Sequence, residues 1–548
     1  MNKKNKQSTS LESSTGLSIH IYDCLKQKQF HLAIETAFKI LQTDSSLVDV
    51  WMNLASAQFN LGQFKEAWIS LQQGLKLNPQ HLNMLVLASG TVAKLKDYTL
   101  AIELCQKILA LQPQHALALS HLAHCYNQRR QYEQAISPAL KALDIEPDSS
   151  HSWLELGFAE LYLDRFEQAL HSFQQGLRLD PNHIDLLSNS AMALAYLGRI
   201  QEAMKKNEEV LRLDPCHENA LNNQAKLLCD LGRYQEGIEL FQKILSQHPD
   251  HWEVVWNLSL VYLVLGDFTT GLNLYQHRLN VASFHQHHHP LPSPHWQGED
   301  IRGKTLLVRC EQGYGDSIQF LRYVPYLTSY GCQIAIEMPS ELHGLFQHLD
   351  APLIGDIDHL PAHDVQVRLM SLMHLLPIDL SSPPAPLSIA NTSLRPIQNR
   401  IGLVWKGNPK HRKDNQRSLN IEQLEPLFHV KGFHYVCLQQ KLTPEETSYL
   451  EAHQVEIFAL HNWRDTVNLL ETCERIICVD TSVAHLAASM GIPTWILLPY
   501  VPDWRWLLER SDTPWYPSVR LFRQTRLDSW DEPIQEIKNT LLTKEMPC

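Results

Sequence analysis

The chain has 548 residues, which corresponds to about three to four domains of typical size and is enough for several buried cores. Its 47 Lys and Arg residues against 59 Asp and Glu give a net charge of −12, so composition argues against a nucleic-acid or anionic-membrane partner. Apolar runs are short, and none follows the charged N-terminal residues, so we expect a cytoplasmic chain without a membrane span.

A 34-residue period runs through the first half. It is marked by six prolines at equal spacing: Pro79, Pro113, Pro147, Pro181, Pro215 and Pro249. At a second fixed position, a small residue recurs eight times, three residues after a bulky apolar one. The small residues are Ala33, Ala67, Ala101, Ala135, Ala169, Ala203, Gly237 and Gly271. A small residue allows two helices to cross closely, so the pattern predicts antiparallel helix pairs.

These repeats resemble the tetratricopeptide repeat over residues 17–283, with about eight units. The resemblance implies an all-α solenoid with a concave groove that binds peptides or proteins, so a protein partner is expected there. Residues 1–16 are expected to be a disordered tail. After Leu279 the period stops, and residues 284–300, rich in Pro, His and Gly, are interpreted as a linker.

No metal site is predicted. The eleven cysteines are scattered without CxxC pairs, which is typical of reduced thiols rather than of a disulfide framework. The histidines between positions 285 and 289 have no Cys or carboxylate beside them, so a solvated linker is favoured. Asp356 and Asp358 spell DxD, but the triplet lies in an irregular stretch and is interpreted as a loop.

The second half alternates short apolar runs with helical stretches. The runs are TLLVRC, QIAIEM, VQVRLM, RIGLVWKG, HYVCLQQ, VEIFAL, RIICVD and TWILLP. Such alternation predicts parallel sheets covered by helices, here two Rossmann-like lobes over residues 301–395 and 396–540, facing each other across a cleft. Ligands of such sheets lie at the carboxyl ends of the strands, so the turns after the strands are the places to look for chemistry.

The turn after the first strand contains Gly313, Gly315 and Asp316, followed by a helix. The glycines allow a tight turn, and the carboxylate falls at a helix N-terminus. A dinucleotide fingerprint is excluded, because Ile318 stands where its third glycine would be. From position alone, Asp316 is either a functional group or a simple helix cap.

A second turn follows RIICVD and contains Asp480, Thr481, Ser482 and, one helical turn later, His485. Free amides at this helix N-terminus would form an anion pocket that suits a phosphate-bearing ligand. The alternative for His485 is a core residue; its position beside Asp480 and the cap favours a functional role.

A cationic loop follows the strand RIGLVWKG. It holds Lys406, Lys410, His411, Arg412, Lys413 and Arg417. In an acidic chain, such a loop at the carboxyl end of a strand indicates charge neutralisation of a diphosphate, and we assign this role to Lys406 and Arg417. The other charges are interpreted as a solvated loop. Further on, Trp504 and Trp506 could cover the cleft or stack on a base, or else pack in the core.

Four stretches together look like the glycosyltransferase domain that follows tetratricopeptide repeats in bacterial proteins and is similar to the heptosyltransferases of glycosyltransferase family 9, a GT-B fold. They are EQGYGDSIQFLRYVP, VWKGNPKHRKDNQRSL, CVDTSVAHLAASMGIPTWILLP and DWRWLLERSDTPWYPSVRLFRQ.

The resemblance implies a nucleotide-diphosphate sugar donor, inversion at the anomeric carbon and no metal or other cofactor. It also implies Asp316 as general base, and Asp480, Thr481 and His485 as donor contacts. Arg417 corresponds to the diphosphate-binding lysine of the family.

The expected function is therefore that of a metal-independent, inverting glycosyltransferase of the hexosyl or heptosyl class. The repeats would recruit a protein or glycan acceptor, or a partner protein. The alternative is a protein-binding scaffold whose second half is a glycosyltransferase-like domain without turnover.

Overall fold

The computed structural model describes residues 14–281, 284, 290–379, 382–387, 389, 395–409, 411, 414–527 and 529–543. Residues 1–13 of the expected tail, the histidines between positions 285 and 289, and Lys410, Arg412 and Lys413 lie outside these ranges. The chain forms two compact units, Met1–Ala220 and Leu221–Cys548. Each unit is described by itself.

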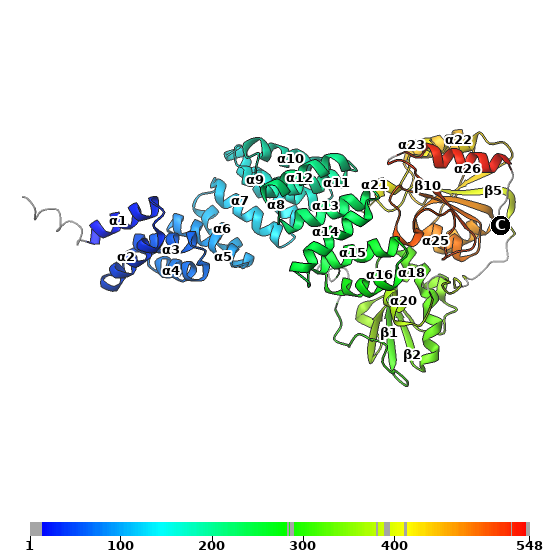
Figure 1. The fold of residues 1–548 in the computed structure, drawn as a ribbon, viewed down its shortest axis with the longest axis horizontal. Coiled ribbons are helices and arrows are strands. Elements are labelled where there is room, and N and C mark those ends of the chain that lie inside the picture. The colour runs from blue at the N-terminus through cyan, green and yellow to red at the C-terminus, as the bar shows by residue number, and fades with distance from the viewer. Residues whose placement is uncertain are drawn as a thin grey trace, which may run out of the picture. The chain divides into compact units, whose positions relative to one another are not determined.

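The first unit consists of helix pairs. The helices are α1 (Ser14–Lys26), α2 (Phe30–Thr43), α3 (Val48–Asn60), α4 (Phe64–Leu77), α5 (Leu82–Lys94), α6 (Tyr98–Leu111), α7 (Ala116–Gln128), α8 (Tyr132–Ile145), α9 (Ser150–Tyr162), α10 (Phe166–Leu179), α11 (Ile184–Tyr196) and α12 (Ile200–Leu213). Figure 1 shows them as coiled ribbons from blue to green.

Two further pairs belong with the second unit, the boundary falling within α13. They are α13 (Glu218–Asp230), α14 (Tyr234–Gln247), α15 (Trp252–Val264) and α16 (Phe268–Tyr275), followed by the 3-10 helix η1 (Gln276–Asn280).

The 34-residue pattern has the expected structural meaning. Each bulky residue, from Phe30 to Phe268, is the first residue of the second helix of a pair, and the six alanines that follow are fully buried. At the two glycine positions there is no room for a side chain: a Cβ on Gly237 would lie 2.5 Å from Cys229 Sγ. The predicted helix pairs are confirmed.

The second unit also contains two parallel sheets. The first has the order β3-β2-β1-β4 and consists of β1 (Thr305–Arg309), β2 (Gln333–Glu337), β3 (Leu353–Ile354) and β4 (Val365–Arg368). The second has the order β10-β9-β8-β5-β6-β7 and consists of β5 (Ile397–Val404), β6 (His434–Cys437), β7 (Glu456–Ile457), β8 (Cys473–Val479), β9 (Thr494–Leu498) and β10 (Val519–Arg523).

All eight predicted strands are present, and the short β3 and the last strand β10 are additional. Counted within its own lobe, the second sheet has the 3-2-1-4-5-6 order of a nucleotide-binding fold, and the first sheet has its 3-2-1-4 part. The chain is therefore an all-α array followed by an α/β region with two Rossmann-like lobes. In the second sheet the strand order reverses between β5 and β8, which is where such folds bind ligands.

Short helices connect the strands. Those used below are α18 (Tyr314–Phe320), the 3-10 helix η2 (Leu321–Tyr330), α21 (Asp414–Arg417), α23 (Pro444–Ala452), α25 (Ser482–Ser489) and the 3-10 helix η7 (Trp504–Trp506); α26 (Asp531–Thr543) ends the described fold.

The two lobes and the last helix pair share one apolar core. It includes Leu263 and Tyr275 of the helix pair, Val308 of β1 and Ile476 of β8. A Cβ on Gly315 of α18 would lie 2.8 Å from His485 Cδ2 of α25, so these helices are in close contact. The cleft expected between the lobes is therefore filled with packed side chains where α18 meets α25.

Part of the predicted linker 284–300 is paired with the first sheet. Gln366 of β4 donates its amide to the Pro294 carbonyl at 2.9 Å and accepts from the Trp296 amide at 2.8 Å. Trp296 is almost fully buried. Its indole anchors this stretch to the lobe, which the Pro and His content of the segment did not indicate.

Candidate functional site

The first part of the candidate site follows β8. Thr481 precedes α25 as its N-cap, and Ser482 is the first residue of the helix. Within the described residues, Thr481 Oγ1 is buried without a hydrogen-bond partner. A helix N-terminus with a spare hydroxyl is suited to an anionic ligand group.

His485 lies on the buried side of α25. Its Nδ1 is 3.1 Å from the Tyr516 hydroxyl, its Nε2 is 3.8 Å from Asp480 Oδ1, and its ring stacks on Trp506 at 5.3 Å. Burial, aided by the nearby Arg505 charge, lowers the pKa of His485 to about 3. His485 is therefore neutral at physiological pH and acts as a hydrogen-bonding group rather than as a cation.

Arg417 connects the β5 loop to the β8 turn. Its Nη1 donates to the Asp480 carbonyl at 3.0 Å, and its Nε donates to Asp414 Oδ1 at 3.0 Å. Gly407 leaves the space for this side chain, since a Cβ there would lie 2.7 Å from Arg417 Nη2. Arg417, Asp480 and the start of α25 thus meet at the reversal of strand order.

Lys406, from the same loop, has a partner elsewhere. Its Nζ donates to both carboxylate oxygens of Glu446 at 2.6 Å. Glu446 also accepts from the Thr443 amide at 2.9 Å in the capping box of α23. Lys406 therefore supports the start of α23 in this structure, while its role as a diphosphate contact stays a prediction.

Asp316 lies in the first turn of α18. Its Oδ2 accepts from the Gly313 amide at 2.8 Å, and its Oδ1 accepts from Arg505 Nη2. Burial raises the pKa of Asp316 above its ordinary value, although the Arg505 charge acts in the opposite direction. Asp316 thus caps its helix and also forms an ion pair with the second lobe.

Arg505 was missed by the sequence reasoning. It lies between Trp504 and Trp506 in η7 and also donates its Nη1 to Asp503 Oδ1 at 2.7 Å. The sequence points to this stretch through its tryptophans and the family resemblance, and assigns no role to Arg505. A single arginine among buried aromatic residues was the available signal, because a buried guanidinium needs carboxylate partners.

Two neighbouring carboxyl groups near Arg417 and Arg505 have opposite pKa shifts. Burial and the adjacent negative charge of Asp503 raise the pKa of Asp480. Burial opposes ionisation of Asp503 as well, but the charge and hydrogen bonds of Arg505 hold its pKa below the ordinary value. Asp503 is therefore the ionised partner of Arg505, and Asp480 is the carboxyl that takes up a proton more readily.

Trp504 and Trp506 are core residues. Both are buried, Trp506 against His485 and Trp504 stacked on Phe320 at 6.1 Å. Core packing, one of the two interpretations of this stretch, is confirmed for these rings.

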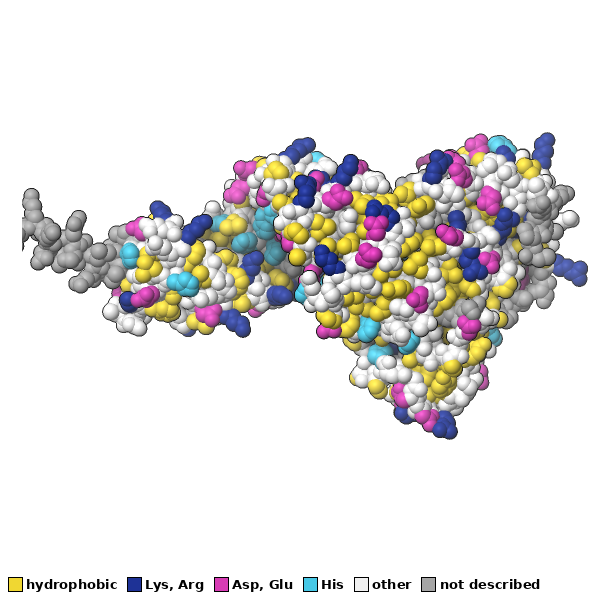
Figure 2. All heavy atoms as spheres, viewed as in Figure 1, with side chains coloured by type: hydrophobic (Ala, Val, Ile, Leu, Met, Phe, Trp, Pro, Cys, Tyr) yellow, Lys and Arg dark blue, Asp and Glu magenta, His cyan; other side chains and the backbone are white. Residues whose placement is uncertain are grey.

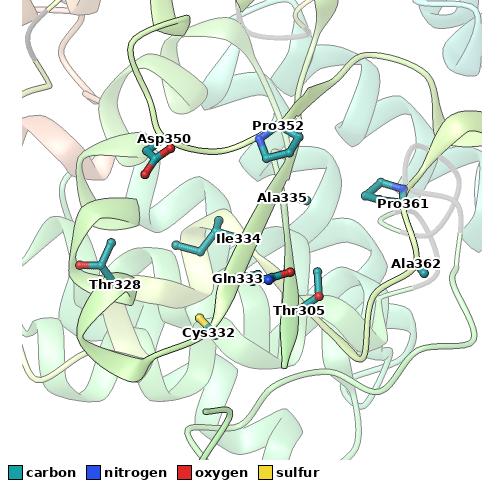
Figure 3. A pocket seen from close by; sticks show the side chains of 10 residues that line it. All are labelled: Thr305, Thr328, Cys332, Gln333, Ile334, Ala335, Asp350, Pro352, Pro361 and Ala362. Carbon is teal, nitrogen blue, oxygen red and sulfur yellow. The ribbon is translucent and has the colours of Figure 1, made fainter. Parts of the chain in front are cut away.

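A depression of about 500 Å³ lies elsewhere on the first lobe (Figure 3). It is lined by Thr305, Thr328, Cys332, Gln333, Ile334, Ala335, Asp350, Pro352, Pro361 and Ala362. Thr305 and Gln333 are the first residues of β1 and β2, so it opens at the amino ends of the strands. Asp316 follows the opposite, carboxyl ends, so this depression is not the candidate site.

The first unit contains a polar cluster that the sequence reasoning did not detect. Glu155 of α9 is 4% exposed and contacts His124 Nδ1 at 2.9 Å and Asn127 Nδ2 at 2.8 Å, both on α7. His151 Nδ1 lies 3.9 Å from the same carboxylate. Figure 2 shows histidines gathered over this part of the array. The contacts join successive repeats, so only a repeat-by-repeat alignment of polar positions could have revealed them.

Among the described residues, no group of three or more His, Cys, Asp or Glu side chains is arranged to hold a metal ion. Asp356 of the DxD triplet is exposed; its Oδ1 accepts from the Asp358 amide at 3.0 Å and its Oδ2 pairs with His359 at 2.8 Å. No helix among the described residues has the length and apolar character needed to cross a membrane.

Sequence profiles of the tetratricopeptide repeat match residues 48–81, 93–154, 150–183 and 222–276. The N-terminal region is a tetratricopeptide-repeat array. It is followed by the α/β region described above, which none of these matches covers.

One curated relative is the protein FlbA of Caulobacter vibrioides, which is 23% identical over 290 residues. The match covers 46% of this chain and 48% of FlbA, so the chain spans about half the length of this relative.

Solved structures with a similar fold include a tetratricopeptide repeat protein from Parabacteroides merdae, with 19% identity and a TM-score of 0.39, covering 45% of this chain and 98% of that one. A thermophilic repeat protein of Thermus thermophilus has 21% identity and a TM-score of 0.30, covering 33% and 99%.

Proposed function

We propose that the chain is an inverting glycosyltransferase that takes a sugar from a nucleotide-diphosphate donor. The observation that carries this proposal is the meeting of Arg417 with the Asp480–Thr481 turn at the reversal of strand order. A guanidinium and a helix N-terminus at that place are the groups that hold a diphosphate in a nucleotide-binding sheet.

Asp316 supplies the base in this proposal. Burial raises its pKa, which makes the carboxylate a stronger proton acceptor, and its ion pair with Arg505 fixes its orientation. It would remove the proton of the acceptor hydroxyl as the sugar is transferred. Arg417 and the amides at the start of α25 would stabilise the charge that develops on the leaving diphosphate. No metal is needed for these steps.

The repeats would present the acceptor or a partner protein. Tetratricopeptide arrays form extended concave surfaces that bind other chains. In this chain the last helix pair shares a core with the α/β lobes, so a bound acceptor would be held by a surface continuous with the second unit.

The experiment is a titration with nucleoside diphosphates of the common bases, followed by calorimetry and by the melting temperature. A donor site should bind one of them, and a ligand at about a hundred times its Kd stabilises the folded state by about 2.7 kcal/mol. Transfer is then assayed with the corresponding sugar nucleotides. Absence of binding by every nucleotide would overturn the proposal.

A second candidate is a protein-binding scaffold with an inactive α/β region. It is favoured by one observation: three of the proposed charged groups already have a protein counter-ion, Asp316 with Arg505, Lys406 with Glu446 and Arg417 with Asp414. Such pairs stabilise a fold without any ligand. The same titration separates the two candidates, because a scaffold of this kind is stabilised by no nucleotide.

A further inference from the structure

The carboxyl end of β1 is in contact with the last tetratricopeptide helix pair. Arg278 of η1 is fully buried; its Nη2 donates to Glu311 Oε1 at 2.6 Å and its Nε donates to Glu311 Oε2 at 3.1 Å. The same Nη2 donates to Ser371 Oγ at 3.0 Å, and the Met370 amide donates to Glu311 Oε1 at 3.1 Å. Glu311 follows β1, and Met370 and Ser371 follow β4.

These contacts fill a particular place in the first lobe. In a sheet of order 3-2-1-4, the ligand crevice lies outside the carboxyl ends of strands 1 and 4, which here are β1 and β4. Arg278 occupies that position with its guanidinium. The repeat side chain therefore stands where a ligand would bind in a free-standing lobe.

A second contact lies one residue further along the chain. Gln312 Nε2 donates to the Tyr275 hydroxyl at 2.6 Å. Gln312 has a φ of +64°, in the left-handed region that a residue with a side chain adopts only when its surroundings hold it there. Tyr275, itself fully buried at the end of α16, provides part of that support.

The turn held in this way carries the proposed base. Gly313 follows Gln312 directly, and its amide binds Asp316 Oδ2 at 2.8 Å. The backbone between Glu311 and Gly313 is thus held by the repeats on one side and donates a hydrogen bond to the Asp316 carboxylate on the other.

We propose that Tyr275 and Arg278 are positioning residues for Asp316, so that the last helix pair is an integral part of the transferase site. The proposal rests on the proposed role of Asp316. It predicts that changes at the repeat end alter the Asp316 turn and the rate of transfer while the nucleotide contacts at α25 stay intact.

The test uses Tyr275→Phe in the full chain, which removes one hydroxyl and keeps the ring. Hydrogen exchange of the amides from Gln312 to Asp316 should become faster by about tenfold, as expected for loss of local protection. The kcat should fall on the order of tenfold, with donor KM and nucleotide affinity within about twofold of wild type. Tyr326→Phe, which removes the hydroxyl of an exposed tyrosine in η2, is the matched control.

Two further variants keep the test decisive. Gln312→Met should reproduce the effect of Tyr275→Phe on the turn, and the double variant should add little, because both remove the same Gln312–Tyr275 hydrogen bond; Tyr275→Phe removes in addition only the weak contact of its hydroxyl with Met370 Sδ at 3.6 Å. Should Tyr275→Phe fail to fold, the double variant Arg278→Met with Glu311→Met removes both buried charges together, which packed cores tolerate better than loss of one partner. It should show the same faster exchange.

The outcomes distinguish failure of the positioning role from failure of the proposed glycosyltransferase function. Unchanged exchange at Gln312–Asp316 in these variants overturns the positioning role, whatever the activity. The positioning role is also overturned if the variants lower the melting temperature, the nucleotide affinity and kcat together, since that pattern indicates a general structural role. If wild type transfers no sugar, the proposed function fails, and the exchange measurement alone decides whether the repeats hold the turn.

Discussion

Arg505 and Asp316 form an ion pair that joins the two α/β lobes, across 189 positions in the sequence. The pair places the proposed base of the first lobe next to the Asp480–His485 segment of the second. Trp506, which follows Arg505, stacks on His485, and the charge of Asp503, which pairs with Arg505, raises the pKa of Asp480. The proposed acceptor side and the proposed donor side are therefore joined through one guanidinium.

Replacement of Asp316 tests the base. Asp316→Asn should still cap α18, because Asn is a comparable cap. Loss of the charge-assisted contact to Arg505 should lower the free energy of unfolding by about 1–3 kcal/mol, with Asp503 still pairing the guanidinium. Transfer should be slower by at least about a hundredfold, the usual value of a general base.

The control for this variant is Asp512→Asn, which breaks an exposed pair with Arg510 in the second lobe. It should leave both stability and transfer nearly unchanged. Near-normal transfer by Asp316→Asn would make Asp316 a helix cap and lobe contact only. Both variants are compared by denaturant unfolding and by steady-state kinetics.

Arg417 should contribute strongly to the affinity for the diphosphate. Arg417→Ala is expected to weaken nucleoside-diphosphate binding by about 1.5–3 kcal/mol, the usual size of a charge-assisted contact. Arg417→Lys keeps the charge and should recover much of that loss. Arg520→Ala, on β10 at a partly exposed pair with Glu536 of α26, should bind like wild type. Equal affinities for all four proteins in calorimetry would show that Arg417 does not contact the ligand.

Acid should destabilise the repeat array through its partly buried histidines. Burial lowers the pKa of His121 to about 4, whereas the unfolded chain titrates near 6.5. Between these values the unfolded chain binds a proton that the native state does not, so stability is complete above pH 6.5 and falls with decreasing pH. The pKa of Glu155 is also lowered, so its contribution is lost as pH falls below its ordinary value, with the same sign.

We expect wild type to lose about 2 kcal/mol more than His121→Asn between pH 6.5 and 4.5, from about 1.4 kcal/mol per pH unit of linkage. Urea unfolding followed by helical circular dichroism at the two pH values measures this difference. His171→Asn, on an exposed position of α10, should behave like wild type. A parallel decline of all three proteins would mean that His121 does not contribute to the acid sensitivity.

Cleavage of the connector should not release the repeats. With a protease site inserted between His287 and His288, we expect the two fragments to elute together in gel filtration at neutral pH. The buried Arg278–Glu311 pair and the contact of Phe268 with Trp515 at 6.2 Å hold them. The same insertion combined with Arg278→Met leaves Glu311 buried without its partner and should weaken the association. Separate elution of the original fragments would show that these contacts do not suffice.

Local sequence patterns determined the elements of this fold. The helix pairs follow from a repeat in which a small residue such as Ala135 recurs at every close crossing, and the strands follow from short apolar runs between helical stretches. Both signals depend on neighbours in the sequence. For the same reason Asp316, Asp480 and Arg417 could be proposed as site residues, since each lies in the segment that follows the carboxyl end of a strand.

Tertiary structure alone decided which of these residues meet. The contacts Asp316–Arg505 and Gln312–Tyr275 join segments 189 and 37 residues apart, and no periodicity encodes them. The structure also gave Lys406 a partner in Glu446, 40 residues away, and brought Trp504 and Trp506 into the core. A buried charge or ring is fixed by whichever distant groups satisfy it, so its partner is determined only when the chain is folded.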